Sequence, residues 1–348
     1  MDEWQQQHRR ACGDIQKLKQ RFGLDDGVDA VAGRYPVRIS EYVLEQIADG
    51  DDLWGRQFLP SAAELNDADA PCDPLAEERL SPLPGLVHRY RHRVLLLAAG
   101  SCFAYCRFCT RKRMVGCAQM AVSFGELMQA LEYIAAHGEI NEVIISGGDP
   151  LTLSNALLSE LLQRLRRIPH VQIIRLGSRA PAVLPSRIDA TLCALLARHQ
   201  PLYFLTHFNH PAELAPAARQ ACAMLVDAGI SVVNQTVLLR GVNDDSSVLG
   251  QLFHNLYCLR VRPYYLHQMD ITRGTGHFRT TLEQGMEIMR QLQGELSGMA
   301  MPIYTVDLPG GHGKIPVTPQ YVRRLGVDAL LVNAAGIEVV YPQRNMET

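Results

Sequence analysis

Three cysteines, Cys102, Cys106 and Cys109, lie within eight residues in the spacing C-x3-C-x2-C. Three thiolates can ligate three irons of a cubane [4Fe-4S] cluster and leave the fourth iron open to a small molecule. A structural zinc site needs four ligands, usually as two separated pairs, and the sequence contains no second CxxC pair. The spacing therefore predicts an iron-sulfur cluster with one open coordination position.

A basic run accompanies the cysteines. Arg107 lies between the second and third cysteine, and Arg111, Lys112 and Arg113 follow the third. These charges would offset the negative charge of a thiolate-ligated cluster or bind anionic ligands, although such a run is more often a solvated surface. The residues alone leave both interpretations open.

The elements that must position these residues alternate regularly from Arg93 onward. Six short apolar runs, rich in β-branched residues, read as strands: VLLLAA, NEVIISGG, VQIIRLGS, LYFLTHFN, SVVNQTVLL and VRPYYLHQ. Helical patterns separate them; one begins at Ser123, where Glu126 completes a capping box, and another at about Ser154. This alternation predicts a parallel sheet with helices outside it, arranged as a partial (β/α)6 barrel. The cysteines follow the first strand, at the strand ends where such barrels carry out chemistry.

The flanking regions differ from the barrel. Residues 1–90 are expected to be mainly helical, 91–280 to form the barrel, and 281–348 to form a C-terminal segment that ends in a β-hairpin. A polar, proline-bearing stretch at 60–85 reads as a loop that wraps the surface.

Composition limits the function classes. The chain has 348 residues, 47% of them hydrophobic, and a formal net charge of -2, which gives no bulk electrostatic reason to expect nucleic acid or an anionic membrane as partner. The nine scattered cysteines argue against a secreted disulfide framework, and the N-terminus has no apolar signal region. We therefore expect a cytoplasmic globular protein that binds neither nucleic acid nor membrane.

The cysteine spacing resembles the signature of the radical S-adenosylmethionine (SAM) superfamily. ISGGDPL at 145–151 is similar to that superfamily's GGE-type motif, with Asp149 in place of the usual Glu. The resemblance implies a cluster whose open iron is chelated by SAM and that cleaves SAM to a 5′-deoxyadenosyl radical. It places Phe108 against the adenine and Gly147, Gly148 and Asp149 beside SAM.

Further segments resemble the lysine 2,3-aminomutase branch, which also uses pyridoxal 5′-phosphate (PLP). HRYRHRVLLL, CRFCTRKR, THFNHP, NQTVLLRGVND, RVRPYYLHQMD, RGTGHFRT and VDLPGGHGK occur in the order of that branch. The resemblance makes Lys314, at the end of a glycine-rich loop, the Schiff-base lysine. That loop does not match the G-x4-GK[ST] phosphate loop, because Ile315 follows the lysine.

The resemblance also implies the remaining site residues. Arg89, Tyr90 and Arg93 would hold PLP, and guanidinium groups suit its phosphate. Arg111 would bind the substrate carboxylate, and His207 and Gln235 would lie near SAM. Asp270 and Asp307 match the two acids that meet the distal ammonium in enzymes acting on lysine, whereas relatives acting on glutamate lack this pair. Two carboxylates attract an ammonium and repel a glutamate side chain.

The implied reaction converts L-α-lysine to β-lysine by 1,2-amino migration, with SAM regenerated and an electron donor such as flavodoxin or ferredoxin. Arginine or ornithine would satisfy the same charges. The best-known free-lysine enzymes are longer and bind zinc through C-terminal cysteines; here Asp245 stands where they have one of those cysteines, so no structural zinc is expected. The shorter length also resembles relatives that supply β-lysine to elongation factor P, while VDLPGGHGK resembles the free-lysine enzymes.

Three points remain open at the level of sequence. A radical SAM enzyme of another reaction type would need no PLP, and a non-catalytic iron-sulfur carrier would not respond to SAM. The region before the barrel is long enough to wrap a neighbouring subunit, which is compatible with a homo-oligomer.

Overall fold

The computed structural model describes residues 3–117, 120, 122–326 and 328–342. Within them, the main sheet contains nine strands in the order β1 to β9. The strands are β1 (Leu86–Tyr90), β2 (Arg93–Ala99), β3 (Glu142–Gly147), β4 (Ile173–Gly177), β5 (Leu202–His207), β6 (Ser231–Leu238), β7 (Arg262–Gln268), β8 (Ile303–Asp307) and β9 (Lys314–Pro316). Neighbours from β2 to β8 pair in parallel, and β1 and β9 add antiparallel edges.

This topology confirms the partial-barrel prediction. The six predicted runs form β2 to β7, and β8 is a further parallel strand that the sequence analysis did not identify. The sheet is curled, so that side chains from its two ends meet. Arg89 on β1 donates to Asp307 on β8 at 3.0 Å, and the backbone N–H of Lys314 on β9 donates to the Tyr90 hydroxyl at 3.1 Å.

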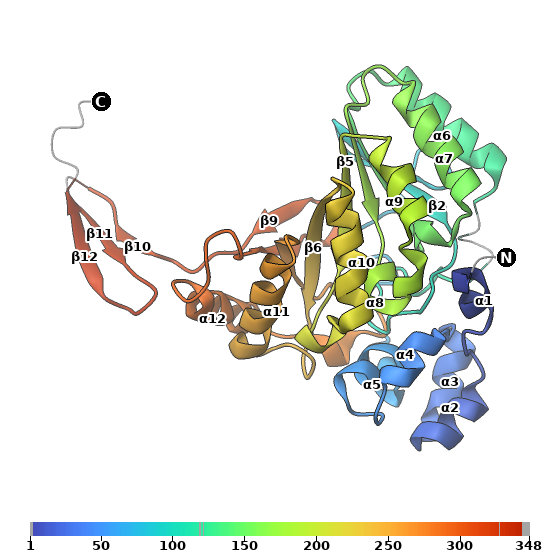
Figure 1. The fold of residues 1–348 in the computed structure, drawn as a ribbon. Coiled ribbons are helices and arrows are strands. Elements are labelled where there is room, and N and C mark those ends of the chain that lie inside the picture. The colour runs from blue at the N-terminus through green and yellow to red at the C-terminus, as the bar shows by residue number, and fades with distance from the viewer. Residues whose placement is uncertain (1–2, 118–119, 121, 327, 343–348) are drawn as a thin grey trace.

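Helices connect the parallel strands and lie together along one side of the curved sheet (Figure 1). They are α6 (Phe124–Ala136), α7 (Asn155–Arg166), α8 (Ala180–Val183), α9 (Ala190–Ala197), α10 (Pro216–Asp227), α11 (Ser246–Cys258) and α12 (Leu282–Leu292). Short 3-10 turns lie at η3 (Pro150–Thr152), η4 (Pro185–Arg187), η5 (Pro211–Glu213), η6 (Gly276–Phe278) and η7 (Pro309–Gly311). The capping box of Ser123 and Glu126 opens α6, and Ser154 caps α7, as predicted.

The N-terminal region is helical, as predicted. Its elements are α1 (Glu3–Arg9), α2 (Ile15–Phe22), α3 (Gly27–Arg34), α4 (Glu41–Gln46), α5 (Leu53–Phe58) and the 3-10 turn η1 (Ala62–Leu65). Many of its buried side chains, Trp4 and Phe58 among them, belong to the same hydrophobic cluster as the barrel residues. The region therefore shares one core with the barrel, and the domain boundaries at 90 and 280 stay predictions.

A small antiparallel sheet follows the barrel and extends away from it (Figure 1). It consists of β10 (Val322–Arg324), β11 (Asp328–Val332) and β12 (Glu338–Pro342), and β11 and β12 form the predicted hairpin. The ends of the chain at 1–2 and 343–348, which belong to the predicted flanking regions, lie outside the described residues. No helix in the described part of the chain is both long and apolar enough for a membrane span.

The stretch at 60–85 is mostly exposed or half-buried loop, as predicted, but it contains one buried acid. Glu64 is 1% exposed and accepts hydrogen bonds from Arg107 at 2.9 and 2.6 Å and from Lys112 at 2.7 Å. Burial raises the pKa of Glu64, but the charges and hydrogen bonds of Arg107 and Lys112 bring it below its usual value. A buried carboxylate was unexpected there because an isolated Glu in a polar stretch reads as exposed until its partners are known.

Candidate active site

A cavity of about 510 Å³ lies inside the curled sheet. Residues of all nine strands, β1 to β9, line it, together with the segment that contains Glu77. Seven of the predicted site residues lie on its wall: Arg89, Tyr90, Arg93, Arg111, Gln235, Asp307 and Lys314. Asp270 lines a second cavity of about 250 Å³, and Asp307 lines both.

Lys314 projects into the larger cavity, with polar partners for its amine. Its Nζ forms an ion pair with Asp307 and lies 3.0 Å from Nδ1 of His267. Burial and the Lys314 charge together lower the pKa of His267 to about 3, although the Asp307 charge opposes the shift. His267 is therefore neutral, so its Nδ1 can accept a hydrogen bond from the ammonium. Sequence analysis did not identify His267, although it lies in the RVRPYYLHQMD segment.

The residues predicted to hold PLP surround the same space. The guanidinium groups of Arg89 and Arg93 lie 4.8 and 4.4 Å from the centre of the Tyr90 ring. Arg89 also donates to the Tyr90 hydroxyl at 3.0 Å. Arg175 of β4, which was not predicted, lines the cavity and pairs with Glu142. This wall offers cationic groups and an aromatic face, which together suit a phosphorylated pyridine ring.

The two predicted acids have different environments. Burial raises the pKa of Asp270 to about 7, and the nearby Asp307 charge adds to the effect. Burial also raises the pKa of Asp307, but Lys314 more than offsets it, and the net pKa of Asp307 lies below its usual value. Since a second cation nearby would favour the ionised form of Asp270, the pair is suited to bind an ammonium group.

Arg111 is held by a carboxylate of the chain itself. Its Nε and Nη2 donate to Glu77 at 2.8 and 2.5 Å, and its Nη1 lies 3.4 Å from the carbonyl oxygen of Gly147. Burial raises the pKa of Glu77, but Arg111 outweighs this and lowers the pKa overall. This two-point contact occupies one edge of the guanidinium and fixes its orientation toward the cavity.

The rest of the basic run is also paired. Arg107 and Lys112 contact Glu64, and Arg113 contacts Asp73 and Glu78 at 3.4 and 3.1 Å. Carboxylates of the 60–85 stretch thus neutralise the run. This corrects the interpretation of the run as a solvated surface, whereas its role in offsetting a cluster or binding an anionic ligand stays a prediction.

The three cysteines occupy the loop after β2 and are close enough to influence one another. Burial raises the pKa of the Cys102 thiol well above its usual value, and the charges of Asp149, Cys109 and Cys106 add to the effect. Burial, and after it the charge of Cys106, also raises the pKa of the Cys109 thiol. Buried thiolates of this kind would need a compensating cation, which the iron of a cluster would supply. The described residues include no trio of His, Cys, Asp or Glu side chains that converges on one metal ion. In a cubane each thiolate ligates a different iron, so the three need not converge on one point.

The GGD motif packs directly against the cysteine loop. Gly148 donates to the Ala99 carbonyl at 2.6 Å, and a Cβ at Gly148 would lie 2.2 Å from the Ser101 carbonyl oxygen. Gly147 has a backbone φ of 127°, a value that residues with a side chain rarely adopt. The glycines therefore allow two backbone segments to touch.

Asp149 is buried and accepts hydrogen bonds from Leu151 N, Ser178 Oγ and Arg179 N at 3.0, 2.9 and 2.9 Å. Burial raises its pKa to about 6, although these hydrogen bonds oppose the shift. Its carboxylate thus links the GGD turn to the end of β4.

Phe108 and His207 lie together at the strand ends. Their rings are 5.6 Å apart, and His207 on β5 is directly opposite Gln235 on β6. Burial and the charge of Arg179 lower the pKa of His207 well below its usual value, so the ring is neutral. These three predicted SAM neighbours are therefore adjacent in the structure.

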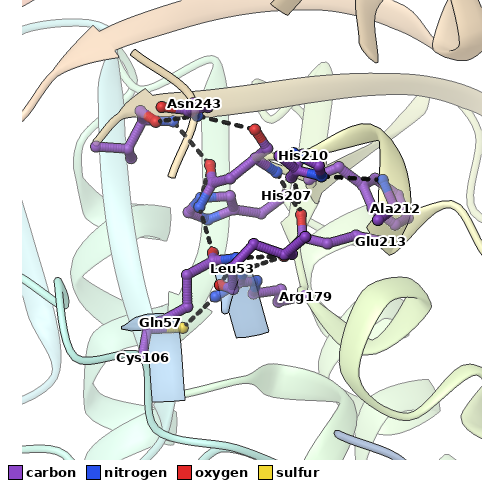
Figure 2. A network of polar contacts seen from close by, with 12 residues as sticks. Leu53, Gln57, Cys106, Arg179, His207, His210, Ala212, Glu213 and Asn243 are labelled. Atoms are coloured by element: carbon purple, nitrogen blue, oxygen red, sulfur yellow. Dashed lines mark hydrogen bonds and ion pairs between the residues drawn. The ribbon is translucent and has the colours of Figure 1, made fainter. Parts of the chain in front are cut away.

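A buried polar network links the cysteine loop to the β4 and β5 ends (Figure 2). Arg179 contacts Cys106, Gln57 and Glu213, and Gln57 accepts from Asn209, which in turn contacts His207 at 3.0 Å. Sequence analysis identified none of Gln57, Arg179, Asn209 and Glu213. The signal was slight, since each is one polar residue in a segment without periodic pattern.

Comparison with protein families gives two matches. The profile of the radical SAM superfamily matches residues 98–248, and the profile "Lysine-2,3-aminomutase" matches residues 289–347. The first match contains the three cysteines and the GGD motif, and the second contains Asp307 and Lys314.

Curated relatives align over most of the chain. An L-lysine 2,3-aminomutase of Fusobacterium nucleatum is 44% identical over 328 residues, 92% of this chain and 77% of that protein. An L-lysine 2,3-aminomutase of Clostridium subterminale is 41% identical over 350 residues, 98% of this chain and 84% of that protein. A glutamate 2,3-aminomutase of Clostridioides difficile is 39% identical over 307 residues, 88% of this chain and 73% of that protein.

Proposed function

Because this chain belongs to the lysine 2,3-aminomutase family of radical SAM isomerases, we propose that it is a PLP-dependent L-lysine 2,3-aminomutase that converts L-α-lysine to β-lysine. Membership in the radical SAM superfamily implies a [4Fe-4S] cluster and SAM. PLP, the substrate and the role of each residue belong to the proposal. One observation carries it: Lys314, Arg111 and Asp307 line one cavity.

The choice of lysine depends on charge, because overall identity to lysine and glutamate aminomutases is similar. Lysine carries a carboxylate at one end and an ammonium at the other. Arg111 offers a guanidinium, and Asp270 and Asp307 offer two buried acids. An ammonium about 4 Å from a carboxylate gains on the order of 4 kcal/mol of Coulomb energy at an effective dielectric near 20. The side-chain carboxylate of a bound glutamate would instead be repelled by a similar energy. Aminomutases acting on arginine or ornithine remain the alternative.

In this proposal Cys102, Cys106 and Cys109 hold the cluster, and Lys314 holds PLP with Arg89, Tyr90 and Arg93. Phe108, Gly147, Gly148, Asp149, His207 and Gln235 surround SAM. When bound, the cluster and SAM would supply a 5′-deoxyadenosyl radical, and PLP would supply a conjugated ring that stabilises an unpaired electron during amino migration. A one-electron donor such as flavodoxin or ferredoxin reduces the cluster.

The protein itself positions the reactants. Arg111 binds the substrate carboxylate through Nη1, because Glu77 occupies its Nε and Nη2. Neutral His267, whose Nδ1 lies 3.0 Å from Lys314 Nζ, accepts a hydrogen bond from the lysine amine and orients it in the cavity. The curled sheet surrounds the cavity, which would limit the access of water to the reacting groups.

An anaerobic assay tests the proposal. Protein reconstituted with iron, sulfide, PLP and SAM is reduced with dithionite and incubated separately with L-lysine, L-arginine, L-ornithine and L-glutamate, and β-amino acids are measured by mass spectrometry. We expect β-lysine at many turnovers per SAM, and no product from the Lys314→Ala variant. Cleavage of SAM without any isomerised amino acid would overturn the substrate and reaction assignments. Undiminished activity of Lys314→Ala would indicate a radical SAM reaction that needs no PLP.

A further inference from the structure

Arg179 connects the cysteine loop to a fixed carboxylate. It follows β4, is 8% exposed, and its Nη1 donates to Sγ of Cys106 at 2.7 Å (Figure 2). Its Nη2 donates to Gln57 and to Glu213, each at 2.7 Å. The guanidinium thus bridges a predicted cluster ligand and a buried acid.

The acid end of this bridge is rigid. Glu213 is 0% exposed and accepts further hydrogen bonds from the Gln57 amide at 3.1 Å and from the backbone N–H groups of Asn209 and His210. Glu213 has no freedom to move without leaving buried donors unsatisfied, which is costly. It therefore holds Arg179 in one place.

Aromatic rings fix the plane of the guanidinium. The Arg179 guanidinium carbon lies 4.8 Å from the centre of the Phe58 ring and 5.1 Å from the centre of the Phe108 ring. A guanidinium that is clamped by two rings and one carboxylate keeps its remaining N–H groups in a defined direction. One of them points at the Cys106 sulfur.

We propose that Arg179 is a positioning residue for the iron-sulfur cluster, and that its N–H donation to Cys106 makes the cluster easier to reduce. The inference rests on the proposed function only in assigning the cluster to the three cysteines. Reduction adds one electron from an external one-electron donor to the cluster, and no bond is formed or broken. Because three thiolates already make the site anionic, a fixed cation with a hydrogen bond to one sulfur stabilises the reduced state more than the oxidised state.

A purely structural role is the competing explanation, since Arg179 also compensates the charge of Glu213. The two explanations differ in the midpoint potential. Removal of Arg179 together with the Glu213 charge leaves no unpaired buried acid, so the double variant Arg179→Met/Glu213→Gln isolates the effect on the cluster. Glu213→Gln alone is the matched control.

The experiment is an EPR-monitored redox titration of the reconstituted cluster without SAM or lysine. We expect the equilibrium constant for reduction of the double variant to be at least tenfold less favourable than that of Glu213→Gln. For one electron this corresponds to a midpoint potential about 59 mV more negative in the double variant. Arg179→Lys keeps a charge beside Glu213 but has no fork to reach both groups, so we expect a shift of the same sign. Arg166→Met removes an arginine that donates to the carbonyls of His199 and Pro201, at the other end of the strands, and should leave the potential unchanged.

Equal potentials in the double variant and in Glu213→Gln would overturn the inference, even if the protein makes β-lysine. A shifted potential in a protein that makes no β-lysine would support the inference and refute the proposed reaction. Failure of the wild-type protein to bind iron and sulfide would refute the cluster assignment and the inference with it.

Discussion

Replacement of Asp270 by Asn should weaken lysine binding in a pH-dependent manner. The substitution keeps the shape of the side chain and removes its charge. Hydrogen bonds to charged groups contribute about 1.5 to 3 kcal/mol, so a loss of about 2 kcal/mol corresponds to roughly thirty-fold weaker binding. The expected loss of about 2 kcal/mol is smaller than the Coulomb energy of about 4 kcal/mol for an ammonium and a carboxylate, because Asp307 remains to bind the ammonium.

The raised pKa of Asp270 determines the sign of the pH effect. Its pKa is about 7, so the carboxyl is mostly protonated at pH 6 and mostly ionised at pH 8. An ammonium binds the ionised form, and the affinity of the wild-type protein for lysine should therefore rise about tenfold from pH 6 to pH 8. Asp270→Asn cannot ionise and should show little change over the same range.

Isothermal titration calorimetry of anaerobic PLP-loaded protein measures both effects. L-Norleucine, which lacks the distal ammonium, is the matched control ligand, and its affinity should be insensitive to the substitution. A flat affinity for lysine between pH 6 and 8 in the wild-type protein, together with unchanged binding by Asp270→Asn, would refute the assignment of this acid to the substrate.

Three further substitutions test other parts of the site and fold. Lys314→Arg keeps a cation beside Asp307 but removes the primary amine; we expect no PLP trapped on the protein by borohydride and at least a thousand-fold loss of activity, and trapped PLP would place its attachment elsewhere. Glu77→Gln frees one edge of Arg111 and should raise KM for lysine about tenfold, equivalent to about 1.4 kcal/mol, while the conservative Glu77→Asp recovers part of it; an unchanged KM would leave Arg111 independent of Glu77. Glu64→Gln leaves Arg107 and Lys112 without their buried carboxylate and should lower the free energy of unfolding by about 3 to 5 kcal/mol, measured by anaerobic chemical denaturation. Full stability of Glu64→Gln would mean that solvent reaches this cluster.

Much of the barrel was predictable because its signals are local. The six apolar runs have the length and composition of buried parallel strands, and the cap at Ser123 depends on a partner only three residues away. The missed strand β8 lies next to the edge strand β9, and the strands β1 and β9 pair antiparallel at the edges, where periodicity is weakest. Edge strands depend on their neighbours for recognition, and a sequence does not contain that information locally.

The sequence by itself determined which reactive groups the protein has. The spacing of the cysteines, the glycine-rich turn at 147–148 and the loop before Lys314 are short patterns whose chemistry depends on residue type and separation. The resemblance then suggested which distant residues act with them. No long-range geometry was needed for these predictions.

Only the tertiary structure decided which charges are free to act. Curling of the sheet brings Tyr90 to Lys314, 224 residues away, and folding of the 60–85 stretch over the barrel pairs Glu64 and Glu77 with the basic run. The same folding set Arg179 against Cys106 and His267 against Lys314. A charged residue has no periodic pattern that reveals its partner, and its ionisation depends on burial and on neighbours from other elements. For this reason the cofactor-binding residues could be predicted one by one, whereas their electrostatic environment required the fold.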